Sequence, residues 1–227
     1  MQPWTRLAEA AAPDGDVLRL LRRGDEFSIR IAGGNELMNS RLGGSEEALA
    51  TLALDRLAGR PALRVLIGGL GMGFTLRAAL ARGGPDLRVE TAEIVPELIA
   101  WARGPMAPVF QGALDDPRAD VLPCDVAALI DAATGAYDAI LLDVDNGPDG
   151  LTRPANGALY APEGLASARR ALRPGGVLAV WSAAPDRAFE ARLRAAGFAV
   201  ETHAVRARKG AKRGPRHTIW LGRAPSG

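Results

Sequence analysis

The chain has 227 residues and a mass of 23.8 kDa, enough for one well-buried domain with a short appendage and too little for two domains of ordinary size. Although 48% of the residues are hydrophobic, no stretch approaches the roughly 20 uncharged apolar residues of a membrane span, and the N-terminal segment lacks a signal-peptide pattern, so we expect a soluble, cytoplasmic protein. The net charge of +2 does not indicate a general polyanion binder, and the single cysteine excludes an internal disulfide.

Residues 1–43 form a small region with β-hairpin signals. The segments LRLLRR and EFSIRI lie on either side of Gly24 and Asp25, which is the arrangement of two strands joined by a tight turn. A hairpin of this size is not stable alone. We therefore expect residues 1–43 to pack as a lid or a dimer edge on a larger domain formed by residues 44–227.

From residue 44 onward, short apolar runs alternate with helical patterns, which is typical of a parallel sheet covered by helices on both faces. Strands are expected at Arg64 to Ile67, Leu87 to Ala92, Ala119 to Leu122, Ala139 to Asp143 and Val177 to Trp181. The last two runs, Phe198 to Val205 and His217 to Gly222, have only one loop between them. They should pair as an antiparallel hairpin at the sheet edge.

The first helix of the larger domain is expected to begin at Ser45, whose hydroxyl can cap it. Glu46 and Glu47 follow in the first turn, where acidic side chains interact favourably with the helix dipole. Leu49 and Leu57 recur at helical spacing. These leucines are predicted to belong to the core and not to a site.

The segment RVLIGGLGMGFTLRAAL, residues 64–80, reads as a strand, a glycine turn and a helix. Such a turn places backbone N–H groups and the positive end of a helix at the carboxyl edge of the sheet, where ligands of open α/β sheets bind. Gly69, Gly71 and Gly73 give G-x-G-x-G, and not the G-x-G-x-x-G of dinucleotide folds, because the sixth position is Phe74. This spacing suits an adenosyl-sulfonium cofactor, although such turns also occur only to join tightly packed elements.

Three acidic residues follow the next strands of the predicted sheet. Glu93 ends the second strand about 20 residues beyond the glycines, where an acid can bind both hydroxyls of a ribose. Asp125 follows the third strand, where it can accept a hydrogen bond from an adenine amino group or cap the next helix. Asp143 ends the apolar fourth strand in AILLDVDNGPDG, where a buried carboxylate is costly unless cations or donors pair with it.

These segments resemble those of the polyamine aminopropyltransferases (spermidine synthases), a family within the class I S-adenosylmethionine-dependent methyltransferase superfamily. The family's glycine segment runs without a gap onto residues 64–80, and its two conserved acids at the next strand ends match Glu93 and Asp125. The resemblance implies an α/β, Rossmann-like fold with a mostly parallel seven-stranded sheet and an antiparallel last strand. It also implies S-adenosylmethionine or its decarboxylated form as cofactor, and at least a homodimer.

The departures from the family bear on the reaction. The family's aspartate inside the glycine segment corresponds here to Met72, which cannot hold an ammonium group, and the family's D-x-x-D-P gate is shortened to residues 143–148. Methyl transfer to a small-molecule nucleophile is therefore the first hypothesis. Aminopropyl transfer from decarboxylated S-adenosylmethionine to a diamine is its alternative. A non-catalytic module that binds an adenosyl ligand is the second alternative.

The predicted site has a catalytic, a substrate and a cofactor part. Asp143 is expected to orient or deprotonate the acceptor, and its pocket is expected to include Asp145, Asn146 and Tyr160. The predicted cofactor-binding residues are Gly69, Gly71, Met72, Gly73, Glu93, Asp125 and Asp143. Without ligands at metal spacing around His203 and His217, no metal site is expected.

The basic stretch RARKGAKRGPR, Arg206 to Arg216, joins the two final strands. A solvated loop is the favoured interpretation. Nucleic-acid binding is not expected, because no aromatic residue lies between the charges to stack on a base. A flap over an anionic substrate stays open as a third interpretation, and His217 beside it could face the substrate.

Overall fold

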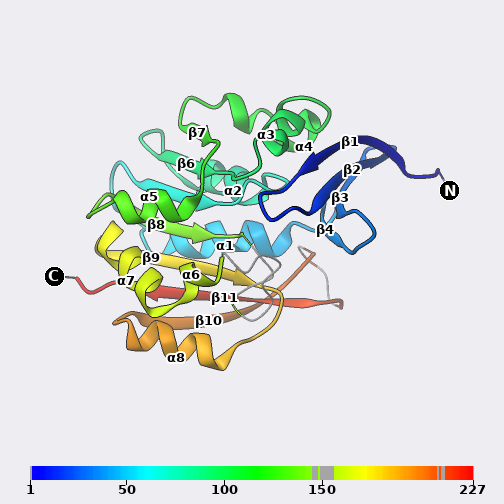
Figure 1. Cartoon of the computed structure of the whole chain (residues 1–227). Coiled ribbons are helices and arrows are strands. Elements are labelled where there is room, and N and C mark those ends of the chain that lie inside the picture. Colours follow the sequence, from blue (N-terminus) through cyan, green and yellow to red (C-terminus); the bar gives the residue numbers. More distant parts are fainter. Residues whose placement is uncertain (1, 145–147, 149–155, 209, 211–212, 227) are drawn as a thin grey trace.

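The computed structural model describes residues 2–144, 148, 156–208, 210 and 213–226, which form two β-sheets with helices around the larger one (Figure 1). The smaller sheet is antiparallel with the order β1-β2-β3-β4, and the larger has seven strands in the order β10-β11-β9-β8-β5-β6-β7. The α/β Rossmann-like fold class with a seven-stranded sheet, expected from the sequence, is thus confirmed.

The N-terminal sheet is larger than the predicted hairpin. Its strands are β1 (Thr5–Ala11), β2 (Val17–Arg23), β3 (Glu26–Ile31) and β4 (Glu36–Asn39). The predicted hairpin is β2–β3, and the outer strands were not foreseen. Buried Leu20 and Ile29 of this sheet belong to the same hydrophobic cluster as Leu49 of the larger domain. The expected boundary between residues 43 and 44 stays a prediction.

Five strands of the larger sheet run parallel to one another, and the last strand is antiparallel to the strands on both of its sides. The strands are β5 (Arg64–Gly68), β6 (Arg88–Ala92), β7 (Ala119–Leu122), β8 (Tyr137–Leu142), β9 (Leu172–Ser182), β10 (Ala199–Arg206) and β11 (Arg216–Arg223). The expected hairpin of the last two runs is present as β10–β11, with β10 at the sheet edge.

Helices cover both faces of this sheet (Figure 1). They are α1 (Gly44–Asp55), α2 (Phe74–Arg82), α3 (Pro96–Arg103), α4 (Ala107–Phe110), η1 (Ala113–Asp115), α5 (Val126–Ala132), α6 (Gly157–Tyr160), α7 (Pro162–Ala171) and α8 (Arg187–Ala195). Strand β5 shows why two layers form: Val65 and Ile67 belong to the cluster with α1 and α2, whereas Leu66 between them belongs to the cluster with α5, α7 and α8.

The start of α1 differs from the sequence expectation. Gly43 is the N-cap residue and makes no side-chain cap, while Ser45 lies inside the first turn, fully buried. Its hydroxyl is bonded to side chains and not to the helix backbone. A serine before two acids matches a capping pattern in sequence, so the pattern alone could not separate these roles.

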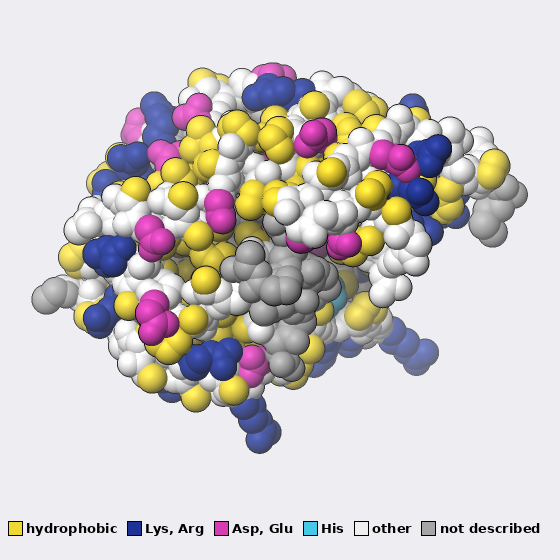
Figure 2. Space-filling view, in the orientation of Figure 1, with side chains coloured by type: hydrophobic (Ala, Val, Ile, Leu, Met, Phe, Trp, Pro, Cys, Tyr) yellow, Lys and Arg dark blue, Asp and Glu magenta, His cyan; other side chains and the backbone are white. Residues whose placement is uncertain are grey.

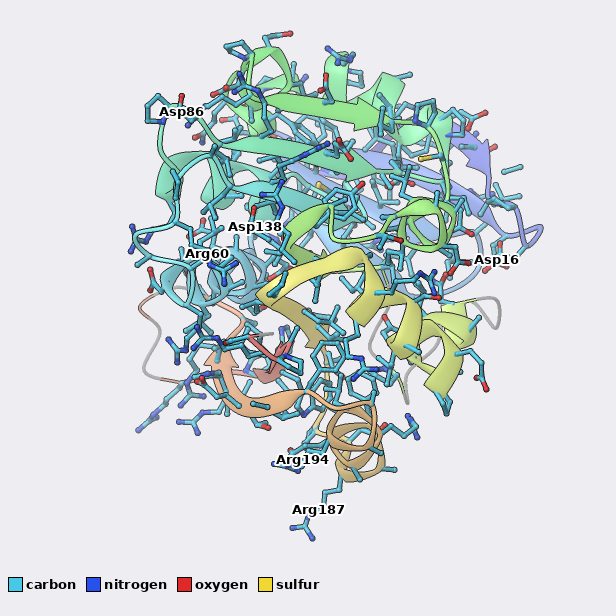
Figure 3. The ribbon with its side chains drawn as sticks, turned by 90° about the vertical axis from the view of Figure 1, so that its left-hand side faces the viewer. Asp16, Arg60, Asp86, Asp138, Arg187 and Arg194 are labelled. Carbon is cyan, nitrogen blue, oxygen red and sulfur yellow. The ribbon has the colours of Figure 1, made fainter. Side chains whose placement is uncertain are left out.

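The amino edge of the large sheet holds a buried ionic cluster. Asp138, near the start of β8, accepts hydrogen bonds from Arg60 (3.3 Å), from Arg173 (2.8 Å) and from the backbone N–H of Arg64 (2.9 Å). Figure 3 shows Arg60 and Asp138 close together, on the opposite side of the molecule from Asp16. This cluster joins the starts of strands β5, β8 and β9 at the amino edge of the sheet. A ligand site is therefore sought at the opposite, carboxyl edge. Among the described helices, none is long and apolar enough to cross a membrane.

Candidate functional site

A cavity lies at the carboxyl edge of the large sheet, between the glycine turn, the N-terminal sheet and the first turn of α1. Figure 2 shows acidic side chains gathered beside the grey residues at the middle of this face. The residues that line the cavity include Asp14, Asp16, Met38, Glu46, Gly69, Leu70, Gly71, Met72, Glu93, Asp125, Asp143 and Trp181. The structure therefore brings together most of the predicted cofactor residues.

The three glycines of the turn meet different surroundings. A Cβ on Gly69 would overlap the backbone carbonyl oxygen of Asp143, and a Cβ on Gly73 would overlap the ring of Phe110. A Cβ on Gly71 would meet only the sulfur of Met38, at 3.8 Å. All three have positive φ angles. Two of the glycines thus permit tight packing, and Gly71 leaves open space beside the cavity. Gly73 itself is not among the lining residues.

Glu93 is buried at the end of β6 and holds the glycine turn. Its carboxylate accepts a hydrogen bond from the backbone N–H of Leu70 at 3.1 Å and another from that of Val95 at 2.9 Å. Only 6% of the residue is exposed, and it lines the cavity. The carboxylate is therefore fixed in place by two backbone donors before any ligand enters.

Asp125 caps a helix and also lines the cavity, and its contact with adenine stays a prediction. It is the N-cap residue of α5 and accepts a hydrogen bond from the backbone N–H of Ala127 at 2.9 Å. It also lines the cavity. Met72 lines the cavity as well and is 3% exposed, so this part of the wall is apolar.

Asp143 and Glu46 form a pair of carboxyl groups on the cavity wall. Asp143 follows β8 and accepts a hydrogen bond from the Thr75 hydroxyl at 3.0 Å. Burial raises the pKa of Asp143 to about 6, against the opposing effect of this bond. Burial and the nearby charge of Asp143 raise the pKa of Glu46 to about 7. Near neutral pH, one of the two groups can hold a proton that the other lacks.

The sequence predicted Glu46 and Ser45 only as residues of a helix start and not as neighbours of the cavity. The Ser45 hydroxyl donates to Glu46 Oε2 at 2.6 Å and lies 2.8 Å from Nδ1 of His217. His217 comes from β11, 172 positions further along the chain. The only hints in the sequence are the position of Glu46 in the first turn of a helix and that of His217 beside the basic stretch. Only the pairing of β11 with β9 brings them together.

Of the three predicted substrate residues, the structure describes only Tyr160. Asp145 and Asn146 lie outside the described residues. Tyr160 is buried in the core, with its ring edge-on to that of Phe189 at a centroid distance of 5.6 Å. It is not among the residues that line the cavity. The described residues contain no group of three or more His, Cys, Asp or Glu side chains that could hold a metal ion.

The described lining of the cavity is acidic. It contains Asp14, Asp16, Glu46, Glu93, Asp125 and Asp143, and no Lys, Arg or His. No described residue of the basic stretch 206–216 is among the lining residues. Trp181 also lines the cavity, although its indole N–H is fully buried and has no hydrogen-bond partner among the described residues. The described lining therefore offers several carboxylates, which suit a cationic ligand.

Curated sequences similar to this chain are polyamine aminopropyltransferases. The one from Mycobacterium tuberculosis is 31% identical over 193 residues, which cover 81% of this chain and 35% of the relative. Polyamine aminopropyltransferase 2 of Pseudomonas aeruginosa is 36% identical over 120 residues, covering 51% of this chain and 32% of the relative. The chain thus spans about a third of the length of these relatives. No protein-family model matches it.

Solved structures similar to this fold include spermidine synthases. One from Thermotoga maritima superimposes with a TM-score of 0.74 at 19% identity, over 98% of this chain and 73% of that one. A spermidine synthase in complex with the transition-state analogue AdoDATO gives 0.73 at 18% identity, over 98% and 72%. A putative O-methyltransferase from Klebsiella pneumoniae gives 0.56 at 18%, over 80% of each chain.

Proposed function

The chain is spermidine-synthase-like in sequence and in its class I methyltransferase fold, and on this premise we propose that it transfers an aminopropyl group from decarboxylated S-adenosylmethionine to an amine. The observation that carries the proposal is the acidic cavity. S-Adenosylmethionine has a carboxylate in its tail, and the described lining contains no Lys, Arg or His to pair with it. The decarboxylated form has only an ammonium and a sulfonium there, and both suit carboxylates.

The adenosine part of this donor would be held at the glycine turn. Gly71 leaves space beside the cavity, and Glu93 is held by two backbone N–H groups in a position to accept from ribose hydroxyls. Asp125 is the acceptor proposed for the adenine amino group. The sulfonium of the donor supplies the electrophilic carbon.

The protein's own part in the reaction is to bind and deprotonate the attacking amine. An amine enters as an ammonium ion at neutral pH, and it becomes a nucleophile only when a base removes a proton. Asp143 and Glu46 face the same cavity, and their raised pKa values lie near neutral pH. Asp143 is the proposed catalytic carboxylate, and the raised pKa values of the pair reduce the cost of accepting the proton.

Methyl transfer, which the sequence analysis placed first, has weaker support than its alternative. That preference rested on Met72, which replaces an acid of the family. Met72 is one apolar part of a cavity whose described lining contains six Asp and Glu residues. Loss of a single acid therefore leaves several others to bind an ammonium group. The relatives are named aminopropyltransferases, and the methyltransferase likeness is confined to fold.

The test is a mass-spectrometric product assay with each donor and a series of linear diamines. The proposal predicts an aminopropylated amine with the decarboxylated donor and no methylated product with S-adenosylmethionine. A methylated amine would overturn the proposal in favour of methyl transfer. Donor binding without any product from any amine would favour the non-catalytic module. Asp120→Asn, at an exposed position on β7, is the matched control for carboxylate variants of the cavity.

A further inference from the structure

The hydroxyl of Thr75 lies between the two residues that carry the carboxyl pair. Thr75 is the second residue of α2, and only 4% of it is exposed. Its Oγ1 donates to Oδ2 of Asp143 at 3.0 Å, and the backbone carbonyl oxygen of Glu46 lies 3.3 Å from the same Oγ1. One small side chain thus contacts the end of β8 and the first turn of α1 together.

The topology of the large sheet brings Thr75 and Asp143 together. Strands β5 and β8 are parallel neighbours, so the end of β8 lies beside the start of the helix that follows β5. The backbone N–H of Asp143 donates to the carbonyl oxygen of Gly68 at 3.0 Å, and its own carbonyl oxygen packs against Gly69. Asp143 is therefore held to the β5–α2 segment by its backbone as well as by its side chain.

The hydroxyl of Thr75 has one proton and two acceptors within reach, so a strong bond to one weakens the bond to the other. The contact with Oδ2 of Asp143 is the shorter, and an ionised carboxylate is a stronger acceptor than a backbone carbonyl group. The proton of Thr75 is therefore directed to Oδ2 when Asp143 is ionised. No other described residue donates to this side chain, which leaves Oδ1 as the oxygen that can accept a proton from a ligand.

The charged groups around Asp143 do not include a cation at the cavity in the described part of the chain. The titratable side chains that line the cavity with it are five carboxyl groups and one thiol: Asp14, Asp16, Glu46, Glu93, Asp125 and Cys124. Behind the wall, Glu47 of α1 lies 4.0 Å from Arg77 of α2, which donates to a backbone carbonyl group. His217 of β11 contacts Ser45. The neutral hydroxyl of Thr75 is therefore the described donor that favours the ionised form of Asp143.

We propose that Thr75 is a positioning residue for the transfer reaction: its hydroxyl keeps the carboxylate of Asp143 ionised and oriented so that Oδ1 accepts the proton of the amine. The inference rests on the proposed transfer to an amine. In this step the N–H bond of the acceptor ammonium breaks and its electron pair stays on nitrogen. The proton forms a bond to Oδ1, while Thr75 keeps its own proton and its bond to Oδ2.

The first test is the pH profile of kcat/KM. Thr75→Val removes the hydroxyl and keeps the shape of the side chain, so Asp143 should bind its proton more tightly. We expect the acidic limb of the profile to move to higher pH by about one unit, which makes the loss of activity about tenfold greater on that limb than on the plateau. Thr75→Ser keeps the hydroxyl and should keep the wild-type limb.

Thr91→Val is the matched control for this profile. Thr91 is a fully buried threonine of β6 whose hydroxyl has no hydrogen-bond partner among the described residues, and it does not line the cavity. Its substitution should leave the profile unchanged. An acidic limb that stays in place in Thr75→Val would overturn the proposal, because the hydroxyl would then serve the Glu46 carbonyl group. A limb that moves equally in Thr75→Ser would also contradict it.

The second test needs no turnover and compares Thr75→Val in the wild-type and Asp143→Asn backgrounds. The pKa of Asp143 is about 6 with the hydroxyl present, and its loss should raise this pKa further in the folded chain only. The Tm of Thr75→Val relative to its parent should therefore fall as the pH rises from about 6 to about 8. In the Asp143→Asn background this difference should not depend on pH. Thr75→Ala also lacks the hydroxyl and carries the same prediction if the valine variant does not fold.

The Tm comparison separates failure of this role from failure of the proposed function. A pH-independent difference in both backgrounds would overturn the role of Thr75. A wild-type protein that transfers no aminopropyl group contradicts the proposed function, and the Tm comparison then still decides whether Thr75 acts on Asp143. Normal transfer by the wild type, together with an unmoved limb in Thr75→Val, contradicts the role of Thr75 alone.

Discussion

The carboxyl group of Asp143 at the end of β8 faces the same cavity as that of Glu46 in the first turn of α1, and the charge on Asp143 helps to raise the pKa of Glu46 to about 7. Two carboxyl groups in such contact titrate as a pair. An ammonium ion that enters the cavity opposes the effect of burial on the pair, because its positive charge favours ionisation of both carboxyl groups. In the proposed reaction, binding of the ammonium ion would therefore leave the pair ionised and able to accept a proton.

Asp143→Asn should leave donor binding largely intact and remove turnover. The amide keeps the shape of the carboxyl group but cannot accept the proton, and it also lowers the pKa of Glu46 by removing a neighbouring charge. We expect kcat to fall by about a hundredfold or more. Steady-state kinetics together with calorimetric binding checks this expectation. Weak donor binding with normal kcat would show that Asp143 serves the donor and not the reaction.

Glu93→Ala should abolish binding of the adenosyl ligand. It also leaves the buried N–H groups of Leu70 and Val95 without their acceptor, which costs about 2 kcal/mol of unfolding free energy. Glu93→Gln keeps an acceptor for only one of the two N–H groups, because each bonds a different carboxylate oxygen, so it should recover part of the stability but not the affinity. Calorimetry and denaturant titration separate the two effects. If Glu93→Ala binds the ligand normally, the cofactor site is assigned wrongly.

Local patterns in the sequence predict most of the large sheet. The runs at residues 64–68 and 137–142 are apolar on both faces, so they read as central parallel strands without any tertiary information. Strand β1, TRLAEAA, was not foreseen because alanine has low strand propensity and the segment is held by its ladder with β2.

The site was only partly predictable for a related reason. Gly71, Glu93 and Asp125 follow directly from strand ends, because the carboxyl ends of parallel strands meet at one edge. The Ser45–His217 contact joins residues 172 positions apart and needs the antiparallel placement of β11. Tyr160 was expected in the substrate pocket, but an aromatic ring after a loop can equally fill the core, as this one does.

The stability of the protein should reveal the carboxyl pair through its pH dependence. The pKa of Asp143 rises from 3.8 to about 6 and that of Glu46 from 4.5 to about 7, so between about pH 4 and pH 7 the folded chain binds more protons than the unfolded chain. Their contribution to the unfolding free energy therefore falls as the pH rises through this window. Asp143→Asn removes the part of this fall in unfolding free energy that ionisation of Asp143 causes.

Thermal denaturation of the wild type and of Asp143→Asn across this window is the measurement. The Tm of the variant minus that of the wild type should increase from pH 4 to pH 7, by the equivalent of about 2 kcal/mol. Titrating groups that do not interact with Asp143 cancel in the difference, whereas Glu46 adds to it, because its pKa is lower in the variant. A difference in Tm that does not change with pH would contradict the raised pKa values.

Asp138→Ala should destabilise the fold without touching the cavity. Asp138 is 3% exposed and accepts bonds from Arg60, Arg173 and the backbone of Arg64 at the opposite edge of the sheet. Its removal should cost about 3 kcal/mol, measured by denaturant unfolding. Glu9→Ala, which breaks an exposed pair with Arg19, should leave the midpoint unchanged. Equal effects of the two substitutions would show that burial does not determine the contribution of the cluster.

The most direct test of the account is calorimetric binding of decarboxylated S-adenosylmethionine and S-adenosylmethionine side by side, with NAD as a control. The acidic cavity predicts tighter binding of the decarboxylated form by about tenfold or more, and Met72→Asp should widen this preference while Met72→Leu leaves it unchanged. Tighter binding of S-adenosylmethionine would contradict the proposed aminopropyl transfer and restore methyl transfer as the function of this fold.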